Sequence, residues 1–206
     1  MSEVLIKSPA KINLYLQILD KRDDGYHNIK THLQLIDIYD HIKFKLSKNR
    51  NIYIKSKESY LNNEDNTIYN AAKKLQKYQK CNSFNGVEIE VDKNIPIGSG
   101  LGGASSNAAS TLIVLNKLWN LNLSEDKLMK IGATIGADVP FFVYGKNAFG
   151  EGIGEKLKEV DMIPDKILIL NPNIHCSTKK MFSLYDKFLK NNKNISLYDQ
   201  NHFWNI

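Results

Sequence analysis

Residues 95–107, with the sequence IPIGSGLGGASSN, hold the residue types best suited to binding a phosphate group. Four glycines fall within positions 98–103, and a helix-like segment that starts near Ser105 follows them directly. Glycine allows positive φ angles and lets an anion approach main-chain N–H groups. The first turn of the following helix adds unpaired N–H groups and the positive end of its dipole. The spacing therefore predicts a phosphate cradle built from backbone.

The dinucleotide-binding fingerprint fits this segment only in part. Gly98, Gly100 and Gly103 have its spacing, and a strand-like segment at residues 87–91 precedes them. That fingerprint also requires a second strand ending in an acidic residue after the helix. Here a second helix-like segment, residues 124–135, follows instead.

The P-loop fits no better. Gly98 and Gly103 have the spacing of its two glycines, but Ala104 and Ser105 stand where that motif needs Lys and then Ser or Thr. A third interpretation, a glycine turn packed closely on a helix, explains one glycine better than four glycines followed by two serines.

Residues 96–107, read as Pro-x-x-x-Gly-Leu-Gly-Gly-x-Ser-Ser-Asn, resemble the ATP-phosphate loop of the GHMP kinases, the superfamily of galactokinase, homoserine kinase and mevalonate kinase. Three further blocks resemble the branch of that family that acts on 4-diphosphocytidyl-2-C-methyl-D-erythritol. They are SPAKINL at 8–14, DGYH at 24–27 and GADVPF at 136–141. Four blocks in the same order argue against chance agreement.

The resemblance implies ATP-dependent phosphorylation of the 2-hydroxyl of this substrate, in the non-mevalonate isoprenoid pathway, with ATP and Mg²⁺ as cofactors. Asn66 and Lys93 match positions near the adenine, and Ser105 or Ser106 is expected to approach Mg²⁺. The sequence does not identify the carboxylate ligand of the metal. The implied nucleotide-binding residues are Asn66, Lys93, Pro96, Gly98, Ser99, Gly100, Leu101, Gly102, Gly103, Ala104, Ser105 and Ser106.

Asp138 is the predicted catalytic base, because phosphoryl transfer to an alcohol needs a base beside the hydroxyl. A lone Asp that follows Gly136 would more often cap a short turn, and the family resemblance is what favours the catalytic role. Lys11 is the predicted partner, since its ammonium can keep Asp138 ionised and stabilise the attacking oxygen. Asn13 is expected to join Lys11 near the hydroxyl.

Tyr26 and His27 follow a turn signal at residues 24–25, and by residue type alone they are ordinary hairpin residues. The resemblance implies that they hold the cytosine end of the substrate and that Phe182 stacks on the base. The implied substrate-binding residues are Asn13, Tyr26, His27, Thr178 and Phe182.

Composition agrees with a cytoplasmic enzyme without singling one out. The 206 residues carry a formal charge of +6, which suits an anionic substrate or a nucleic acid equally well. Arg22 and Arg50 are the arginines among many lysines, a bias typical of an AT-rich genome, so we expect no nucleic-acid partner. Cys81 and Cys176 are isolated, which favours a reducing compartment, and neither a signal peptide nor a membrane span is visible.

The pattern of elements indicates an α+β protein. The alternation of apolar and polar residues predicts strands at 4–7, 12–19, 29–38, 42–46 and 52–55. Helices are expected at 66–79, directly after the glycine loop, at 124–135 and at 179–189. A further, buried strand is expected at 166–170. The resemblance narrows the fold to the left-handed βαβ fold shared with ribosomal protein S5 domain 2.

The expected division is an N-terminal GHMP kinase domain at 1–163 and the incomplete start of a C-terminal domain at 164–206. The resembled enzymes carry a second glycine-rich motif, and nothing after Gly154 supplies it. We therefore expect a truncated kinase, weakly active or inactive alone, that self-associates through the apolar faces of residues 166–170 and 179–189. Two alternatives stay open: an inactive fragment, and an S5-like module that binds RNA through its basic surface.

Overall fold

The computed structural model describes residues 3–61, 63–79, 85–161, 166–172 and 178–191. The strands are β1 (Glu3–Lys21), β2 (His27–Ser47), β3 (Ile52–Ser56), β4 (Gly86–Asp92), β5 (Ala148–Glu151) and β6 (Lys156–Glu159). The helices are the 3₁₀ turn η1 (Ser59–Leu61), α1 (Thr67–Gln76), α2 (Gly103–Leu118), α3 (Glu125–Ala133), α4 (Val139–Tyr144) and α5 (Thr178–Asn191). The strands form one sheet in the order β3-β4-β2-β5-β6, with β1 also paired to β2.

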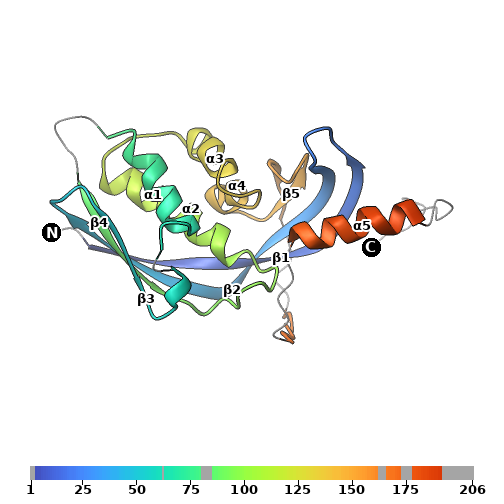
Figure 1. The fold of residues 1–206 in the computed structure, drawn as a ribbon, viewed down its shortest axis with the longest axis horizontal. Helices are drawn as coiled ribbons and strands as arrows, with labels where there is room; N and C mark the ends of the chain where they lie inside the picture. The colour runs from blue at the N-terminus through green and yellow to red at the C-terminus, as the bar shows by residue number, and fades with distance from the viewer. Residues whose placement is uncertain (1–2, 62, 80–84, 162–165, 173–177, 192–206) are drawn as a thin grey trace.

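β1 and β2 form one long antiparallel hairpin that runs through the whole molecule (Figure 1). Four of the predicted β segments are therefore two continuous strands. The register shifts between Pro9, which lies opposite Tyr39, and Ala10, which lies opposite Ile36. This bulge interrupts the in–out alternation, so that Ala10 and Lys11 are both buried although they are neighbours. The irregularity turns Lys11 toward the interior.

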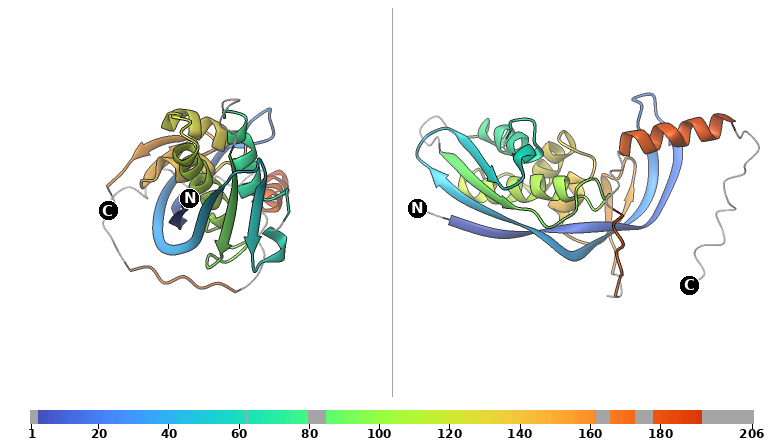
Figure 2. Two further views of the ribbon diagram at one scale, coloured as in Figure 1. Left: turned by 90° about the vertical axis from the view of Figure 1, so that its left-hand side faces the viewer. Right: turned by 60° about the horizontal axis from the view of Figure 1, so that its bottom comes forward.

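Helices α1 to α4 cover one face of the sheet (Figures 1 and 2). The largest fully buried side chains between the two layers include Ile42, Phe44, Ile89, Leu112, Leu115 and Phe141. α2 is the central helix, and nine of its residues are buried, which accounts for its largely uncharged sequence. α1 crosses between the parallel strands β3 and β4, in which Ile52 lies opposite Val87. The arrangement confirms the α+β prediction.

The predicted strand at 166–170 is wrong. Leu168 and Leu170 are 84% and 82% exposed, and within the described residues no strand pairs with this segment. An apolar run becomes a strand only where a neighbour supplies hydrogen-bond partners. Ile169 alone of this run packs on the small cluster of Ala10, Ile95 and Leu101.

The helix predicted at 179–189 is confirmed as α5, which lies beside the far end of the β1–β2 hairpin (Figure 1). The helix predicted to start near Ser105 begins two residues earlier, at Gly103. None of the helices in the described part of the chain is long and apolar enough to cross a membrane.

Candidate functional site

The glycine loop has the backbone geometry that its sequence predicts. Gly98, Gly100 and Gly102 have φ angles of 65°, 78° and 77°, and Gly102 is the left-handed N-cap of α2. The Ser106 N–H donates the first bond of the helix to the carbonyl of Gly102, at 2.9 Å. The N–H groups of residues 103–105 therefore precede the helical ladder and can bind an anion.

Two of the glycines, Gly102 and Gly103, are closely surrounded by side chains, and Gly102 also has a positive φ. A Cβ at Gly102 would lie 2.8 Å from ring atoms of Phe142 and 3.1 Å from Cγ of Lys11. A Cβ at Gly103 would lie 3.1 Å from Nζ of Lys93. The side chains of these two lysines thus reach the loop, where their charges favour an anionic ligand.

Neighbouring elements hold the loop from two sides. The backbone N–H of Lys11 in β1 donates to the carbonyl of Leu101 at 3.0 Å. The hydroxyl of Thr67, the first residue of α1, donates to the carbonyl of Ala104 at 2.8 Å. The cradle is therefore fixed by β1 and by α1 before any ligand binds.

A chain of three buried hydroxyls joins β1 to α2. The Ser8 and Ser106 hydroxyl oxygens are 2.8 Å apart, and the Ser110 hydroxyl donates to that of Ser8 at 3.0 Å. The Ser106 side chain is thus committed to the protein interior. Of the two serines expected to approach Mg²⁺, Ser105 is the half-buried one beside the loop.

The predicted catalytic pair is brought together next to this loop. Nζ of Lys11 lies 3.5 Å from Oδ2 of Asp138, with exposed side-chain fractions of 6% and 42%. The Lys11 ammonium also donates to Oδ1 of Asn13 at 2.6 Å, and the Asn13 amide donates to the hydroxyl of Thr31 at 2.7 Å. Asp138 precedes α4, but its side chain makes no capping hydrogen bond. Its carboxylate therefore pairs with Lys11 and does not cap α4.

The two residues expected near the adenine have other partners. Oδ1 of Asn66 caps α1 by accepting from the N–H of Tyr69 at 2.8 Å, and its amide donates to the carbonyl of Leu61 at 2.6 Å. Lys93 forms an ion pair with Asp40, a carboxylate that is fully buried. Neither side chain is left uncommitted in the structure.

Sequence reasoning missed Asp40. Its signal was present, because Asp40 shares the inward-facing alternation of β2 with Ile42 and Phe44. A carboxylate at an inward position of an amphipathic strand predicts a buried partner.

The side chains predicted to hold the cytosine lie where the hairpin meets α5. The imidazole of His27 stacks on Phe182, with ring centroids 5.0 Å apart and an interplanar angle of 16°, and its Nε2 lies 2.7 Å from Oδ1 of Asp186. Lys21 also pairs with Asp186. Hydrogen bonding from Lys21, and then from His27, lowers the pKa of the Asp186 carboxyl. Tyr26 is 56% exposed beside them.

The structure does not test two predictions for the site, the role of the Thr178 side chain and the ligands of the metal. Thr178 begins α5, but its side chain lies outside the described residues. Among the residues that are described, no cluster of three His, Cys, Asp or Glu side chains could hold a metal ion.

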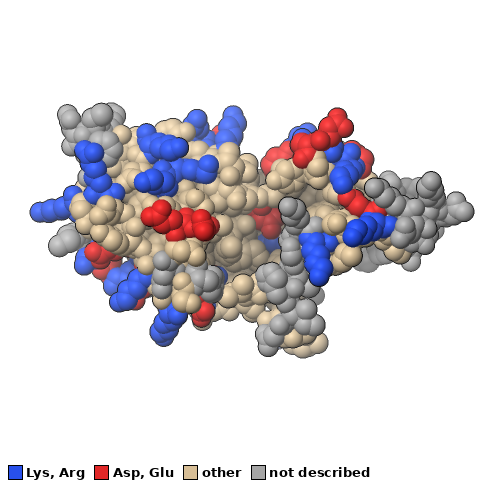
Figure 3. Space-filling view, viewed as in Figure 1, with Lys and Arg blue, Asp and Glu red and all other residues tan. Residues whose placement is uncertain are grey.

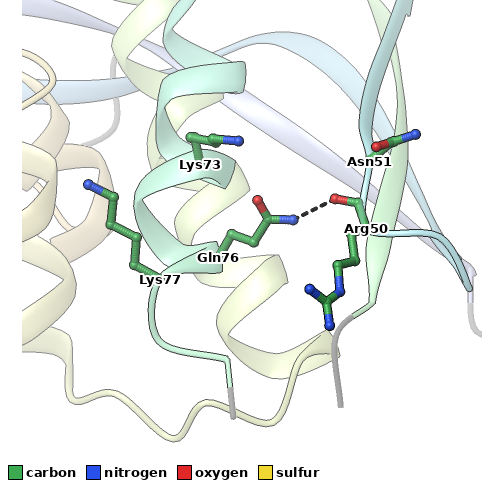
Figure 4. Close-up of a pocket in the computed structure, with 5 residues that line it drawn as sticks. All are labelled: Arg50, Asn51, Lys73, Gln76 and Lys77. Carbon is green, nitrogen blue, oxygen red and sulfur yellow. Dashed lines mark hydrogen bonds between the residues drawn. The ribbon is translucent and has the colours of Figure 1, made fainter. Parts of the chain in front are cut away.

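A separate shallow pocket contains none of the predicted site residues (Figure 4). Its lining residues are Arg50, Asn51, Lys73, Gln76 and Lys77, and the Gln76 amide donates to the carbonyl of Arg50 at 2.7 Å. On the face seen in Figure 3, acidic side chains are interspersed among the basic ones, so the positive charge forms no continuous patch there.

Comparison with known proteins is consistent with this geometry. Residues 66–146 match the family described as GHMP kinases N terminal domain. The chain is 44% identical over 189 residues to the 4-diphosphocytidyl-2-C-methyl-D-erythritol kinase of Marinomonas sp. (strain MWYL1), covering 92% of this chain and 61% of the relative. It is 48% identical over 179 residues to the enzyme of that name from Francisella tularensis subsp. tularensis (strain FSC 198), covering 87% and 65%.

Solved structures agree on the fold. A crystal structure of 4-(cytidine 5'-diphospho)-2C-methyl-D-erythritol kinase matches with a TM-score of 0.67 and 32% identity, over 78% of this chain and 56% of that one. The mevalonate kinase of Methanococcus jannaschii matches at 0.57 and 19% identity, over 78% and 56%, which supports the fold alone. The chain spans 61% to 65% of the length of the two curated relatives. The matched domain, the sequence identity and the solved structures agree with one another: residues 66–146 match the N-terminal domain of the GHMP kinases, and the chain has the GHMP kinase fold.

Proposed function

We propose that this chain carries the phosphoryl-transfer site of an ATP-dependent kinase that acts on the 2-hydroxyl of 4-diphosphocytidyl-2-C-methyl-D-erythritol. The observation that carries the proposal is the 3.5 Å pair of Lys11 and Asp138 beside the glycine loop. The substrate is the one named for relatives at 44% and 48% identity.

The Asp138 carboxylate takes the proton of the substrate hydroxyl as the oxygen–phosphorus bond forms. The Lys11 ammonium keeps that carboxylate ionised and stabilises the negative charge that develops on the attacking oxygen. Asn13, which accepts a hydrogen bond from Lys11, orients the ammonium. The bond between the γ-phosphorus and the bridging oxygen of ATP breaks, and ADP leaves with that electron pair.

The loop fits a nucleoside triphosphate, because three positive-φ glycines and the free first turn of α2 present main-chain N–H groups to an anion. Mg²⁺ would neutralise phosphate charge there. Mg²⁺ in such sites binds mainly phosphate oxygens and waters, with few protein ligands. That mode of binding agrees with a half-buried Ser105 hydroxyl as the one nearby serine ligand.

At the acceptor end, Phe182 has one ring face covered by His27, so its opposite face is the one on which a cytosine stacks. Exposed Tyr26 precedes His27 in sequence and offers a second aromatic side chain at this end of the site. The proposed location is the cytoplasm, as the isolated cysteines suggest.

The test is a coupled ADP-release assay with the cytidylated substrate, set beside mevalonate, homoserine and galactose, for the wild-type chain and for Asp138→Asn. We expect ADP release with the cytidylated substrate alone and its loss in the variant. Turnover with another alcohol instead would move the chain to a different GHMP kinase activity. Salt-sensitive RNA binding without ATP turnover would favour the RNA-binding alternative.

We also propose that a second copy of this chain covers its exposed apolar side chains. Leu168, Leu170, Met181, Leu184 and Phe188 are all exposed by 47% or more. Sedimentation at tens of micromolar is expected to detect a dimer or larger species, and Leu168→Ser with Leu170→Ser should weaken it. A wild-type monomer under those conditions contradicts the proposal.

A further inference from the structure

Asp40 is a buried carboxylate without a role in the chemistry proposed above. It has no solvent exposure, and it lies on β2 where that strand passes beneath the start of the glycine loop segment. Oδ1 accepts from the backbone N–H groups of Asn94 and Ile95, both at 2.8 Å, and Oδ2 pairs with the ammonium of Lys93. Burial of an unpaired charge is costly, so a fully buried carboxylate needs hydrogen bonds or an ion pair on both of its oxygens.

The three residues that Asp40 binds are the connection between β4 and the glycine loop. β4 ends at Asp92, and the loop begins directly after Ile95. A Cβ at Gly103 would lie 3.0 Å from Cγ2 of Ile95 and 3.1 Å from Nζ of Lys93. The groups that Asp40 fixes are therefore in contact with the first turn of α2, where the phosphate cradle forms.

A second connection reaches the same turn from the residue opposite Asp40. Ser8 is the cross-strand partner of Asp40, and its hydroxyl bonds with that of Ser106 in α2. One cross-strand pair of the hairpin thus contacts both sides of the glycine loop. Asp40 binds residues 93–95, which precede the loop, and Ser8 binds Ser106 in α2, which follows it.

We propose that Asp40 is a positioning residue for the nucleotide site, which sets the path of residues 93–95 so that the glycine loop and the first turn of α2 form a cradle before ligand binds. The part of this proposal that concerns nucleotide rests on the proposed kinase function. Preorganised N–H donors bind an anion without reorganisation, so losing the anchor weakens binding although Asp40 does not touch the ligand.

The experiment compares two double variants, Asp40→Asn with Lys93→Met and Asp40→Leu with Lys93→Met. Both remove the buried charges together, which avoids the unpaired ammonium that a single change would leave. Asn keeps a side-chain oxygen that can accept from the N–H groups of Asn94 and Ile95, whereas Leu has no acceptor. Asp37→Asn, an exposed carboxylate change on the same strand, is the matched control.

Two readouts apply. Hydrogen exchange of a peptide covering residues 94–104 is expected to be at least tenfold faster in the Leu double variant than in the Asn one, with equal exchange in α3 as the internal reference. Calorimetric ADP affinity is expected to fall at least tenfold in the same comparison, while Asp37→Asn stays within about twofold of wild type.

Equal exchange and equal affinity in two folded double variants overturn the proposal, as does faster exchange throughout the protein in the Leu variant. If the wild-type chain binds no ADP, the proposed kinase function fails, and the exchange of residues 94–104 decides the positioning role by itself.

Discussion

The two ends of the proposed site are built in different ways. At the phosphate end, β1, β2 and α1 hold the glycine loop and the start of α2 through buried side chains and backbone bonds, among them those of Asp40 and Ser8. At the acceptor end, α5 meets the hairpin through Asp186 and the stack of Phe182 on His27, beside exposed Tyr26. Anion binding requires fixed N–H groups, whereas a nucleobase binds by stacking on an aromatic face. The phosphate end is therefore held by buried contacts, whereas the acceptor end keeps an exposed aromatic side chain.

The largest effect on turnover is expected at Asp138, the proposed base between the phosphate end and the acceptor end. Asp138→Asn should lower turnover by about two to four orders of magnitude, the usual loss when a positioned acid–base group is removed. Binding of ADP and of the cytidylated substrate should stay nearly unchanged, because the amide keeps the shape of the carboxyl. Stopped-flow or coupled assays measure the turnover, and calorimetry measures the binding of the two ligands. Near-normal turnover would show that Asp138 is not the base.

Crowding at the phosphate end is tested at Gly102. Gly102→Val places a Cβ 2.8 Å from the Phe142 ring at a φ of 77°, so strain of about 1–3 kcal/mol adds to a clash. ATP affinity should fall at least tenfold while affinity for the cytidylated substrate changes little. Gly100→Val is the matched variant, since its φ is 78° but a Cβ there meets nothing within 4 Å. A larger loss at Gly100 than at Gly102, or equal loss of both ligands, would contradict the crowding argument.

The acceptor end is tested by Phe182→Ala and Tyr26→Ala. Each should cost about 1–3 kcal/mol of binding free energy per lost stack, which raises KM for the cytidylated substrate by the corresponding factor and leaves KM for ATP unchanged. Steady-state kinetics with each substrate varied separately provide the measurement. If KM for the cytidylated substrate is unaffected, these rings do not hold the base.

The smallest effect concerns docking of α5. The Asp186 pKa is lowered by Lys21 and His27, so the ionised carboxylate is favoured when α5 is docked. The contact is then fully present above the ordinary Asp pKa and is lost as pH falls through the lowered value. Hydrogen exchange of α5 should be faster in Asp186→Asn at neutral pH, and exchange of that variant, corrected for intrinsic rates, should not accelerate further in acid. The same acid response in wild type and variant would assign the pH effect to another group.

Much of this protein follows from local sequence. Positive φ at Gly98, Gly100 and Gly102, the strands of the hairpin and the caps of α1 and α3 were predictable, because each depends on residues close together in the chain. The proximity of Lys11 and Asp138 was expected from the family resemblance and from no spacing rule.

Tertiary structure decided the rest. A register shift at Pro9 turns Lys11 inward, and bulges depend on how two strands pair rather than on either strand alone. Residues 166–170 have the composition of a buried strand but lie exposed, since within the described residues no partner strand runs beside them. Asp40 reads as one polar residue in an amphipathic strand, and only folding brings residues 93–95 onto its two oxygens. Sequence sets which groups are present and their local geometry, and long-range packing determines which of them meet.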